Sequence, residues 1–465
     1  MISKSDIKFS HTNGIRNRYF FIILTIFFLS FEILSFDFSC GLYIIALFFL
    51  CLGGLLKDYI YTGTLNVFYG KYFFLLSFFL LHGIGFFTYQ LRQYLGIGVF
   101  EHPDGLIRIS LLYSIIAVII FLLSYSFGKR FIRLKISFSK NIRLKKMFDN
   151  PQMKWYILLL VICLFTFLLW GLMGNIPVLI ENYHQSARAD VGKNLGLFEA
   201  IIESLINLSF LYIIICLKNR MHSSFLWVFL IGIISLFLLN VDRGGMVGYL
   251  LSMWIIYFVC VKKATLKQFL IICSLIIALA GIMGAMRIKS MGDWIILGGI
   301  IASEASVEFD NYVEVFNMTK ENTYLHGSTL IPILTLPIPR TILPDKDKYL
   351  TAGNYFKEFH NHTHIRVGER ISYIGELYLN FGITGIILGM MLVGILLSIV
   401  DKSLDTTSVL SIYFYLQFIR TFAGFVNGDI ATVVVGFFMN NLLILVALVL
   451  IKLLIYNKKH EKSLC

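Results

Sequence analysis

The stretch ELYLNFGITGIILGMMLVGILLSIV, residues 376–400, carries one charged side chain, Glu376, and is otherwise almost wholly apolar. A helix needs roughly 20 apolar residues to cross the hydrocarbon core of a bilayer. Because lipid satisfies no backbone polar group, a spanning segment must be a helix or part of a closed barrel, and a continuous apolar run favours the helix. Residues 376–400 therefore predict a transmembrane helix.

Apolar runs of this kind recur along nearly the whole chain. The chain is 58% hydrophobic and only 14% charged, whereas a soluble domain is about half apolar and about a quarter charged. We therefore predict an all-α polytopic membrane protein with about twelve transmembrane helices. The predicted spans are 19–36, 40–56, 72–90, 109–127, 155–173, 197–217, 224–240, 244–260, 268–286, 376–400, 408–426 and 430–451.

A long polar segment, residues 287–375, interrupts this pattern directly before the quoted stretch. It holds four of the seven prolines and the histidines of the run HNHTH at 360–364. The chain thus divides into helices one to nine in 1–286, a large loop over 287–375, and helices ten to twelve with a tail in 376–465. We expect the loop to be partly helical, to lie outside the lipid, and to carry chemistry or recognition.

The distribution of basic residues predicts the orientation. With the N-terminus in the cytoplasm, the cytoplasmic segments carry 25 of the 40 Lys and Arg. Their net charge is +19 against −6 for the rest of the chain, as the positive-inside rule requires. Both termini are then cytoplasmic and the loop 287–375 lies on the outer side of the membrane. The basic balance indicates topology and attraction to anionic lipid headgroups, and gives no reason to expect nucleic-acid binding.

Arginine at the predicted outer face is the first candidate for a binding role. Arg243 stands in VDRGG, directly before the predicted eighth helix. A helix N-terminus favours anions, and a guanidinium group binds phosphate or pyrophosphate in a bidentate manner. A surface pair between Asp242 and Arg243 is the alternative. The further arginines that we assign to the same anion site are Arg188, Arg287, Arg340, Arg370 and Arg420.

Arg420 differs from the others because it lies inside a predicted transmembrane helix. A charge in such a helix usually faces a cavity or a partner. Asp429, nine residues further on, could form a structural pair with it. Arg420 therefore has two interpretations, an anion contact and an Arg420–Asp429 pair.

Carboxylates supply candidates for a general base. Glu376 begins the predicted tenth helix, at the boundary of the membrane, where a carboxylate could accept a proton from a substrate hydroxyl. Its alternative role is to complement the helix dipole. Glu369, in the loop nearby, is a second catalytic candidate. Glu199 and Glu203 could line the same cavity or pair with an arginine.

The histidines of HNHTH do not predict a metal site. No cysteine lies near His360, His362 and His364, and their spacing is not that of HExxH. We instead expect His364, together with Tyr373, to contact sugar. The chain has no Walker A motif, no G-x-G-x-x-G after a strand and no G-x-S-x-G. These absences disfavour a nucleotide-driven pump and an α/β hydrolase, and no cofactor is expected.

Four motifs in order are similar to those of a known family. They are VDRGG at 241–245, HGSTLIPILTLPIPRTILPDK at 326–346, GERISYIGELYLNFGITGI at 368–386, and Arg420 followed by GFVNGD at 424–429. The chain resembles the Wzy-type oligosaccharide repeat unit polymerases of bacterial surface polysaccharides over about residues 240–430, and in its hydropathy and large loop.

The resemblance implies an inner-membrane enzyme of the GT-C type with its site on the periplasmic side and no metal. Such an enzyme transfers a growing glycan from undecaprenyl pyrophosphate onto the next lipid-linked repeat unit of an O-antigen or capsule. Membrane lipids, a chain-length regulator and a flippase are the implied partners. The related O-antigen ligases carry a histidine near the helix that follows the large loop, where this chain has Glu369, Arg370, Ile371 and Ser372.

Two alternatives remain open from the sequence. The first is an O-antigen ligase, which this missing histidine disfavours. The second is a lipid-linked oligosaccharide flippase or another transporter, which would place polar residues at mid-membrane depth and show paired repeat halves. The chain instead gathers its charges at the two faces and has one asymmetric loop.

Overall fold

The computed structural model describes nine stretches of the chain and a few isolated positions, Asn441 among them. The stretches are residues 38–62, 69–94, 100–134, 205–219, 243–261, 304–319, 324–338, 342–361 and 369–439. Every regular element in these stretches is a helix. This confirms the predicted helical class for the described part of the chain.

Five apolar segments are long enough to cross a membrane. They are Cys40–Ile60, Gly70–Gln93, Asp104–Phe131, Tyr373–Ser403 and Val409–Asn427. The elements that form them are α2 (Phe38–Thr62), α3 (Gly70–Phe79) with η1 (Leu80–Ile84) and α4 (Gly85–Tyr94), α5 (Asp104–Phe131), α16 (Tyr373–Ser403) and α17 (Val409–Asn427). The chain is therefore an integral membrane protein, and five of the predicted spans coincide with these segments.

Three shorter apolar helices fall within other predicted spans. These are Leu205–Lys218, Gly248–Cys260 within α10 (Arg243–Cys260), and Ile430–Met439. The predicted spans at 19–36, 155–173, 224–240 and 268–286 lie outside the described stretches.

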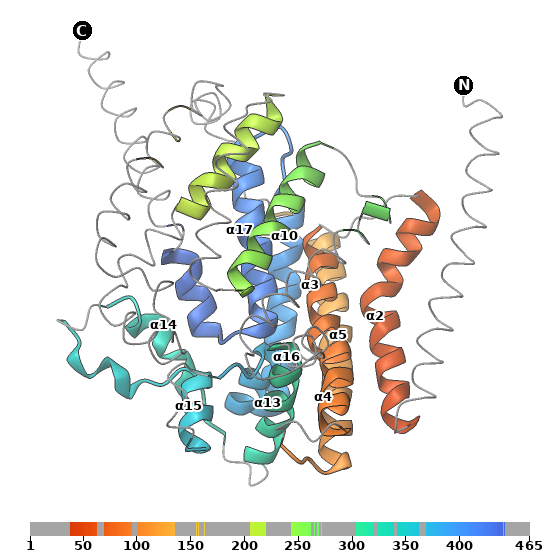
Figure 1. Cartoon of the computed structure of the whole chain (residues 1–465), viewed down its shortest axis with the longest axis vertical. Helices are drawn as coiled ribbons and strands as arrows, with labels where there is room; N and C mark the ends of the chain where they lie inside the picture. Colours follow the sequence, from red (N-terminus) through yellow and green to blue (C-terminus); the bar gives the residue numbers. More distant parts are fainter. Residues whose placement is uncertain are drawn as a thin grey trace, which may run out of the picture.

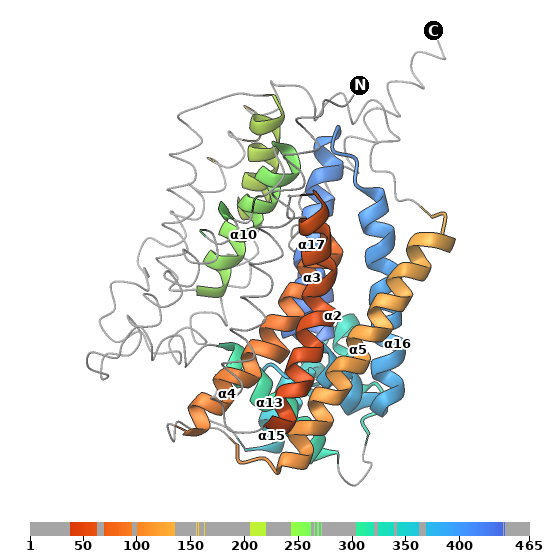
Figure 2. The same cartoon turned by 90° about the vertical axis from the view of Figure 1, so that its right-hand side faces the viewer.

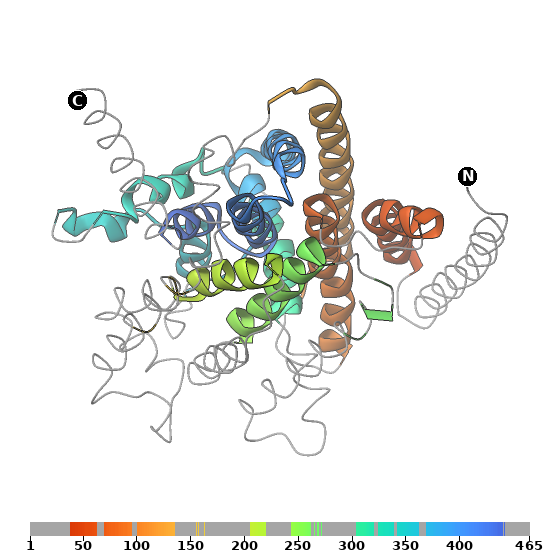
Figure 3. The same ribbon diagram turned by 90° about the horizontal axis from the view of Figure 1, so that it is seen from above.

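The spanning helices form a bundle in which α5 runs alongside α16 and α2 flanks α3 and α5 (Figures 1 and 2). Seen from above, α17 lies between α16 and α10 (Figure 3). Small residues allow the close approach of α5 and α16. A Cβ atom on Gly394 would overlap with Ser124 Oγ and would lie 2.7 Å from the Phe121 carbonyl oxygen. Such close backbone contact is the usual means of packing helices in lipid.

A sharp turn at Gly382 divides α16 into two parts. Gly382 has φ 62° and ψ −151°, which no helical residue adopts. The Tyr373 hydroxyl donates to the Gly389 carbonyl at 3.3 Å, whereas residues 16 apart in a straight helix would be about 24 Å apart. The half-helix Tyr373–Phe381 therefore folds back against Ile383–Ser403. The prediction of one continuous helix over 376–400 was wrong, because glycine supplies the positive φ at which the run reverses.

The described parts of the segment 287–375 contain two longer helices and three short turns of helix. They are α13 (Glu304–Met318), η3 (Ser328–Leu330), α14 (Pro332–Thr335), η4 (Pro344–Lys348) and α15 (Ala352–Phe359). Buried Phe309, Val313 and Phe316 join α13 to the main core. The Tyr312 hydroxyl donates to the Ser110 carbonyl of α5 at 2.9 Å. The loop thus packs onto one end of the bundle.

The opposite end of the bundle is closed by Asp401 and Lys402 of α16. The Asp401 carboxylate accepts from the amides of Gly70 and Lys71, which begin α3, at 3.0 and 3.1 Å. The Lys402 ammonium group donates to the carbonyls of Gly128 and Ile132, which end α5, at 2.9 and 2.8 Å. An acid at a helix N-terminus and a base at a helix C-terminus each satisfy groups that the helix leaves unpaired.

Candidate functional site

Glu376 lies on the folded-back half of α16 and is completely buried. Its Oε1 accepts from the Thr329 hydroxyl at 2.8 Å, and its Oε2 accepts from the Ile430 amide at 2.6 Å. The residue was expected at the mouth of a straight helix. Because α16 folds back at Gly382, the carboxylate instead lies inside the bundle, between the large loop and the segment that follows α17.

The loop segment that holds Thr329 runs along the half-helix of α16. The amides of Leu325 and His326 donate to the carbonyls of Leu379 and Asn380 at 3.0 and 3.1 Å. These carbonyls precede the turn at Gly382, where the helix can no longer satisfy them. Backbone that leaves the helical pattern near lipid needs such protein partners.

Asn380 joins this loop segment to Glu376. Its side-chain oxygen accepts from the Gly327 amide at 2.9 Å, and its side-chain nitrogen donates to Thr329 Oγ1 at 2.7 Å. Because Thr329 then has its own proton free for Glu376, Asn380 fixes the direction of the Thr329–Glu376 hydrogen bond.

Asp429 supplies a second buried carboxylate beside Glu376, since the Ile430 amide that bonds Glu376 belongs to the next residue. Its Oδ2 accepts from the Gly353 amide at 3.2 Å. Its Oδ1 is buried and has no hydrogen-bond partner among the described residues. Burial raises the pKa of the Asp429 carboxyl, an effect that Thr351, Gly353 and Arg370 oppose. Buried carboxylate oxygens rarely lack a hydrogen-bond donor, and those that do are candidates for proton transfer.

The entry to α16 is strained at Ser372. This serine has φ 62° and ψ 157°, a backbone conformation that is rare outside glycine and costs about 1–3 kcal/mol. Its hydroxyl accepts from the Gly375 amide at 3.2 Å, and its carbonyl accepts from the Glu376 amide at 3.0 Å. The strained residue therefore fixes where the half-helix begins and where Glu376 points.

Arg370 is the described arginine next to the carboxylates. It donates to Glu308 at 3.1 Å, and its side chain is 52% exposed. Its carbonyl accepts from the Asn311 side chain at 3.1 Å, which fixes the backbone against α13. Its positive charge acts on Asp429. A partly exposed cation thus lies next to the two carboxylates.

Two buried acids of α13, Asp310 and Glu314, contact histidines. His102 contacts Asp310 at 2.8 Å and Glu314 at 3.4 Å, and His360 contacts Glu314 at 3.6 Å. Within the described residues no group of three or more His, Cys, Asp or Glu is arranged to hold a metal ion. These contacts tie residue 102 and α15 to α13.

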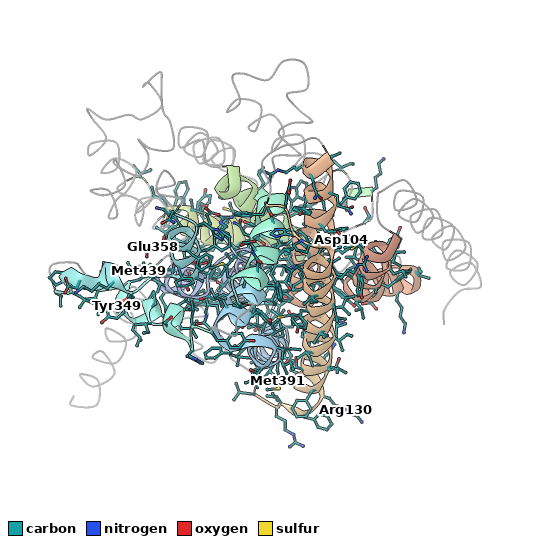
Figure 4. All side chains as sticks on the ribbon, turned by 90° about the horizontal axis from the view of Figure 1, so that it is seen from below. Asp104, Arg130, Tyr349, Glu358, Met391 and Met439 are labelled. Atoms are coloured by element: carbon teal, nitrogen blue, oxygen red, sulfur yellow. The ribbon has the colours of Figure 1, made fainter. Side chains whose placement is uncertain are left out.

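A cavity of about 250 Å³ opens on the loop next to Thr351. Its lining combines apolar and polar groups. Figure 4 labels Tyr349 near the outer edge of the loop and Glu358 closer to the bundle. The lining residues are Leu336, Lys346, Tyr349, Leu350, Thr351, Asn354, Lys357 and Glu358. Thr351 belongs both to this cavity and to the surroundings of Asp429.

Two of the residues predicted for the site pack against other parts of the protein. Arg420 donates to the side chains of Asn207 and Gln417 at 3.2 and 3.4 Å and lies over the Phe210 ring. The Arg420–Asp429 pair is not among the contacts of the described residues. Tyr373, expected to contact sugar, is 6% exposed and bonds Gly389, which gives it a role in closing the hairpin of α16.

Of the remaining predicted residues, the structure describes Glu369 and the backbone of Arg243. Glu369 is half-buried, and its amide donates to the Gly353 carbonyl at 3.2 Å. Arg243 begins α10, but its side chain lies outside the described part of the structure. The predicted residues that lie wholly outside it are Arg188, Glu199, Glu203, Arg287, Arg340, His362 and His364.

Sequence reasoning missed Thr329 and Asn380 and gave Asp429 only a pairing role. Hydroxyl and amide residues are common in loops, so neither Thr329 nor Asn380 stands out in the sequence. Asp429 had a signal, because it stands in NGD directly before an apolar run. An Asp there is typical of a helix N-cap, and the Val433 amide does donate to the Asp429 carbonyl at 3.0 Å.

Comparison with known protein families gives a match over nearly the whole chain. The family described as O-antigen polysaccharide polymerase Wzy matches residues 18–459, nearly the whole chain. No curated protein and no solved structure matches the chain.

Proposed function

Because the chain belongs to the O-antigen polysaccharide polymerase Wzy family, we propose that it joins undecaprenyl-pyrophosphate-linked oligosaccharide repeat units into a surface polysaccharide. Membership implies a polymerising enzyme of the glycosyltransferase type that acts on lipid-linked oligosaccharides in a membrane. The proposed setting is the periplasmic face of the inner membrane, with twelve spans, a GT-C-like arrangement, cytoplasmic termini, and the loop 287–375 outside. A chain-length regulator and a flippase are the proposed partners.

The reaction forms one bond and breaks another at the donor's anomeric carbon. The acceptor sugar's hydroxyl oxygen bonds to that carbon, and the bond from carbon to the pyrophosphate oxygen breaks. Both electrons of the broken bond leave with the pyrophosphate, and the hydroxyl proton passes to a carboxylate. No nucleotide is needed, because the leaving pyrophosphate supplies the driving force.

The carboxylate pair of Glu376 and Asp429 supports this proposal. Both oxygens of Glu376 accept hydrogen bonds, whereas Oδ1 of Asp429 accepts none from the described residues. We therefore assign proton acceptance to Asp429. Glu376, the candidate from the sequence, lies beside it, and its hydrogen bonds to Thr329 and Ile430 hold together the loop and the segment after α17.

The leaving pyrophosphate needs positive charge where its own charge develops. Arg370 is half-exposed next to Asp429 and suits this role. The predicted Arg243 and Arg340 remain candidates for the same function. For each, the planar guanidinium group, which can bind two phosphate oxygens at once, would matter more than the positive charge alone. Accordingly Arg243→Lys should restore little of the activity that Arg243→Ala removes.

The experiment uses a strain that lacks the chain and produces the repeat unit. Loss of polymerisation leaves one repeat unit attached to the core, loss of a ligase leaves none, and loss of a flippase is poorly tolerated. The wild-type chain should restore the ladder of glycan lengths, and Asp429→Asn at equal protein level should not. A normal ladder with Asp429→Asn would show that this residue takes no part in the reaction. A core without any repeat unit in the deletion strain would contradict the assignment as a polymerase.

A further inference from the structure

Four large apolar side chains stand exposed on the loop. Leu334 is 75% exposed, Ile342 73%, Ile331 42% and Leu336 38%. We call these four residues the apolar ridge. Water-facing loops of soluble proteins rarely gather such side chains, and a contiguous exposed set marks a contact surface.

The hydrogen bonds of the loop place the beginning of this ridge at membrane depth. Leu325 bonds Leu379, three residues from the turn at Gly382, whereas Thr329 bonds Glu376, six residues from it. At 1.5 Å per residue, Thr329 lies about 9 Å inward from the turn. The loop therefore runs back into the bundle as it approaches Ile331. Figure 1 agrees, since α14 lies level with the end of α17, further into the bundle than α13 and α15.

The length of the second part of α16, compared with the thickness of the bilayer, also places Thr329 below the membrane surface. The segment Ile383–Ser403 after the turn is about 30 Å long, which matches the hydrocarbon core. The turn at Gly382 then marks one boundary of the core. Thr329 and the ridge that follows lie on the inner side of this boundary.

The ridge also continues the surface of α16 that must face lipid. On α16, Leu388 is 60% exposed and Leu392 55%, and Phe381 next to the turn is 40% exposed. The loop touches this surface, since a Cβ atom on Gly327 would lie 3.0 Å from the Phe381 ring and 4.0 Å from Leu330. The exposed apolar surface of α16 thus meets the loop where Gly327 contacts Phe381.

Charged groups border the ridge on its other side. The Lys346 ammonium group donates to the carbonyls of Ile338 and Leu336 at 2.8 and 3.3 Å, which ties η4 to the ridge. Lys348 and Asp345 form an ion pair at 2.8 Å with both side chains about three-quarters exposed. An apolar face bordered by lysine is typical of segments that lie at the membrane interface.

We propose that the apolar ridge is a membrane-contact surface, seated among the lipid acyl chains of the leaflet on the Glu376 side. The loop is then held at two places, by lipid at the ridge and by Thr329 at Glu376. Lipid contact would keep Thr329 against the carboxylate and would set the height of α15 relative to the bilayer. This inference stands on the loop geometry alone and does not depend on the proposed function.

The test uses the full chain in liposomes of phosphatidylethanolamine and phosphatidylglycerol. Leu334→Cys and Ile342→Cys carry a nitroxide label in a background without the seven native cysteines. Glu358→Cys, an exposed position on α15 of the same loop, is the matched control. We expect the ridge labels to be relaxed mainly by oxygen, which partitions into hydrocarbon, and the control mainly by a water-soluble nickel complex.

Two outcomes would overturn the proposal. Ridge labels as accessible to nickel as the control would show that the ridge faces water. Ridge labels shielded from both reagents would show that protein covers it, either a second copy or another chain.

A second measurement needs no substitution and therefore survives a failure of the cysteine variants to fold. A hydrophobic diazirine probe is activated in liposomes that contain the wild-type chain, and the labelled peptides are identified by mass spectrometry. Labelling of both Leu388–Leu392 and the ridge is expected. Labelling of Leu388–Leu392 without the ridge would contradict the lipid contact.

Discussion

At one end of α16 the Asp401 carboxylate accepts four hydrogen bonds, from the amides of Gly70 and Lys71 and the hydroxyls of Tyr125 and Tyr415. Each of these donors lies within 3.1 Å of a carboxylate oxygen. Beside the other end, the Asp429 carboxylate accepts from the Gly353 amide through Oδ2 and is also stabilised by Thr351, whereas its Oδ1 accepts no hydrogen bond from the described residues. Both carboxylates are shielded from water, Asp429 almost fully and Asp401 in part. The two therefore differ more in the number of hydrogen bonds that they accept than in their burial.

In the function that we propose, the difference separates a structural from a reactive carboxylate. A buried acid whose oxygens are all bonded holds helices together, and replacing it should affect folding. A buried acid with an unbonded oxygen is poorly satisfied in the folded state, and a substrate proton can satisfy it. The predictions below test this distinction between Asp401 and the pair of Asp429 and Glu376.

The largest expected effect is the loss of proton acceptance. Asp429→Asn keeps the shape of the side chain but removes its basicity, and we expect turnover to fall by about 10²–10⁴. Glu376→Gln should also be severe, because the amide would turn an N–H group toward Thr329 or Ile430. Polymerisation by purified protein in liposomes measures both. Asp345→Asn, on an exposed side chain of the same loop, is the control and should remain fully active.

The pH profile should follow from the same assignment. Burial raises the pKa of Asp429, so this carboxyl takes up a proton at a higher pH than the ordinary value of about 3.9. A base must be ionised to act, and turnover should therefore fall on acidification before an ordinary aspartate would titrate. Turnover of the wild-type chain measured against pH tests this. A rate that stays constant down to the ordinary aspartate range would contradict the role of Asp429.

Gly382→Ala should break the turn that creates the site. The residue has φ 62°, and a Cβ atom would lie 3.0 Å from the Tyr324 ring. We expect a loss of about 1–3 kcal/mol in stability together with reduced turnover, because the half-helix carries Glu376. Thermal unfolding in detergent measures the first effect. Gly53→Ala, with nothing within 4 Å of its Cβ position, is the control, and equal melting of the two variants would argue against a strained turn.

Asp401→Asn should lower stability without affecting the chemistry. The substitution leaves one acceptor oxygen for donors from three helices, and we expect a loss of about 1–3 kcal/mol. Thermal unfolding and turnover per folded molecule should be measured together. If this variant kept its stability but lost turnover, the distinction between the two ends of α16 would fail.

Thr329→Val should have the smallest effect. It removes the hydroxyl that donates to Glu376, a hydrogen bond worth about 1 kcal/mol, which corresponds to roughly a fivefold fall in turnover. It also removes the acceptor of the Asn380 side chain, which keeps its bond to the Glu376 carbonyl. Thr329→Ser keeps the hydroxyl and should behave as the wild type in the same liposome assay. If the serine variant, which keeps the hydroxyl, were as slow as the valine variant, the hydrogen bond to Glu376 would not account for the loss.

Helices that depend on a local apolar run were predictable. The runs at 40–56, 72–90 and 109–127 correspond to α2, to α3 with η1 and α4, and to α5, because burial in lipid requires only length and composition. The turn inside α16 was not predictable in the same way. Glycine is frequent in transmembrane helices, so Gly382 in NFGITG carried no signal that the chain reverses there.

Side-chain partners were the least predictable part. Arg420 and Asp429 are nine residues apart and of opposite charge, which suggested a pair. In the fold Arg420 bonds Asn207, 213 residues away, and Asp429 bonds the amide of Gly353. The packing of α17 against the helix at 205–218 decides the first contact, and the docking of α15 decides the second.

By itself, the sequence determined that this is a helical membrane protein, that one large segment leaves the apolar pattern, and that Glu376 stands where the pattern resumes. These features follow from the hydrophobicity of contiguous residues. Only the tertiary structure decided which carboxylate is fully bonded, because the donors to Glu376 and Asp429 come from 47, 54 and 76 residues away. Hydrogen bonds over such distances exist only after the half-helix of α16, the loop and the end of α17 have packed together.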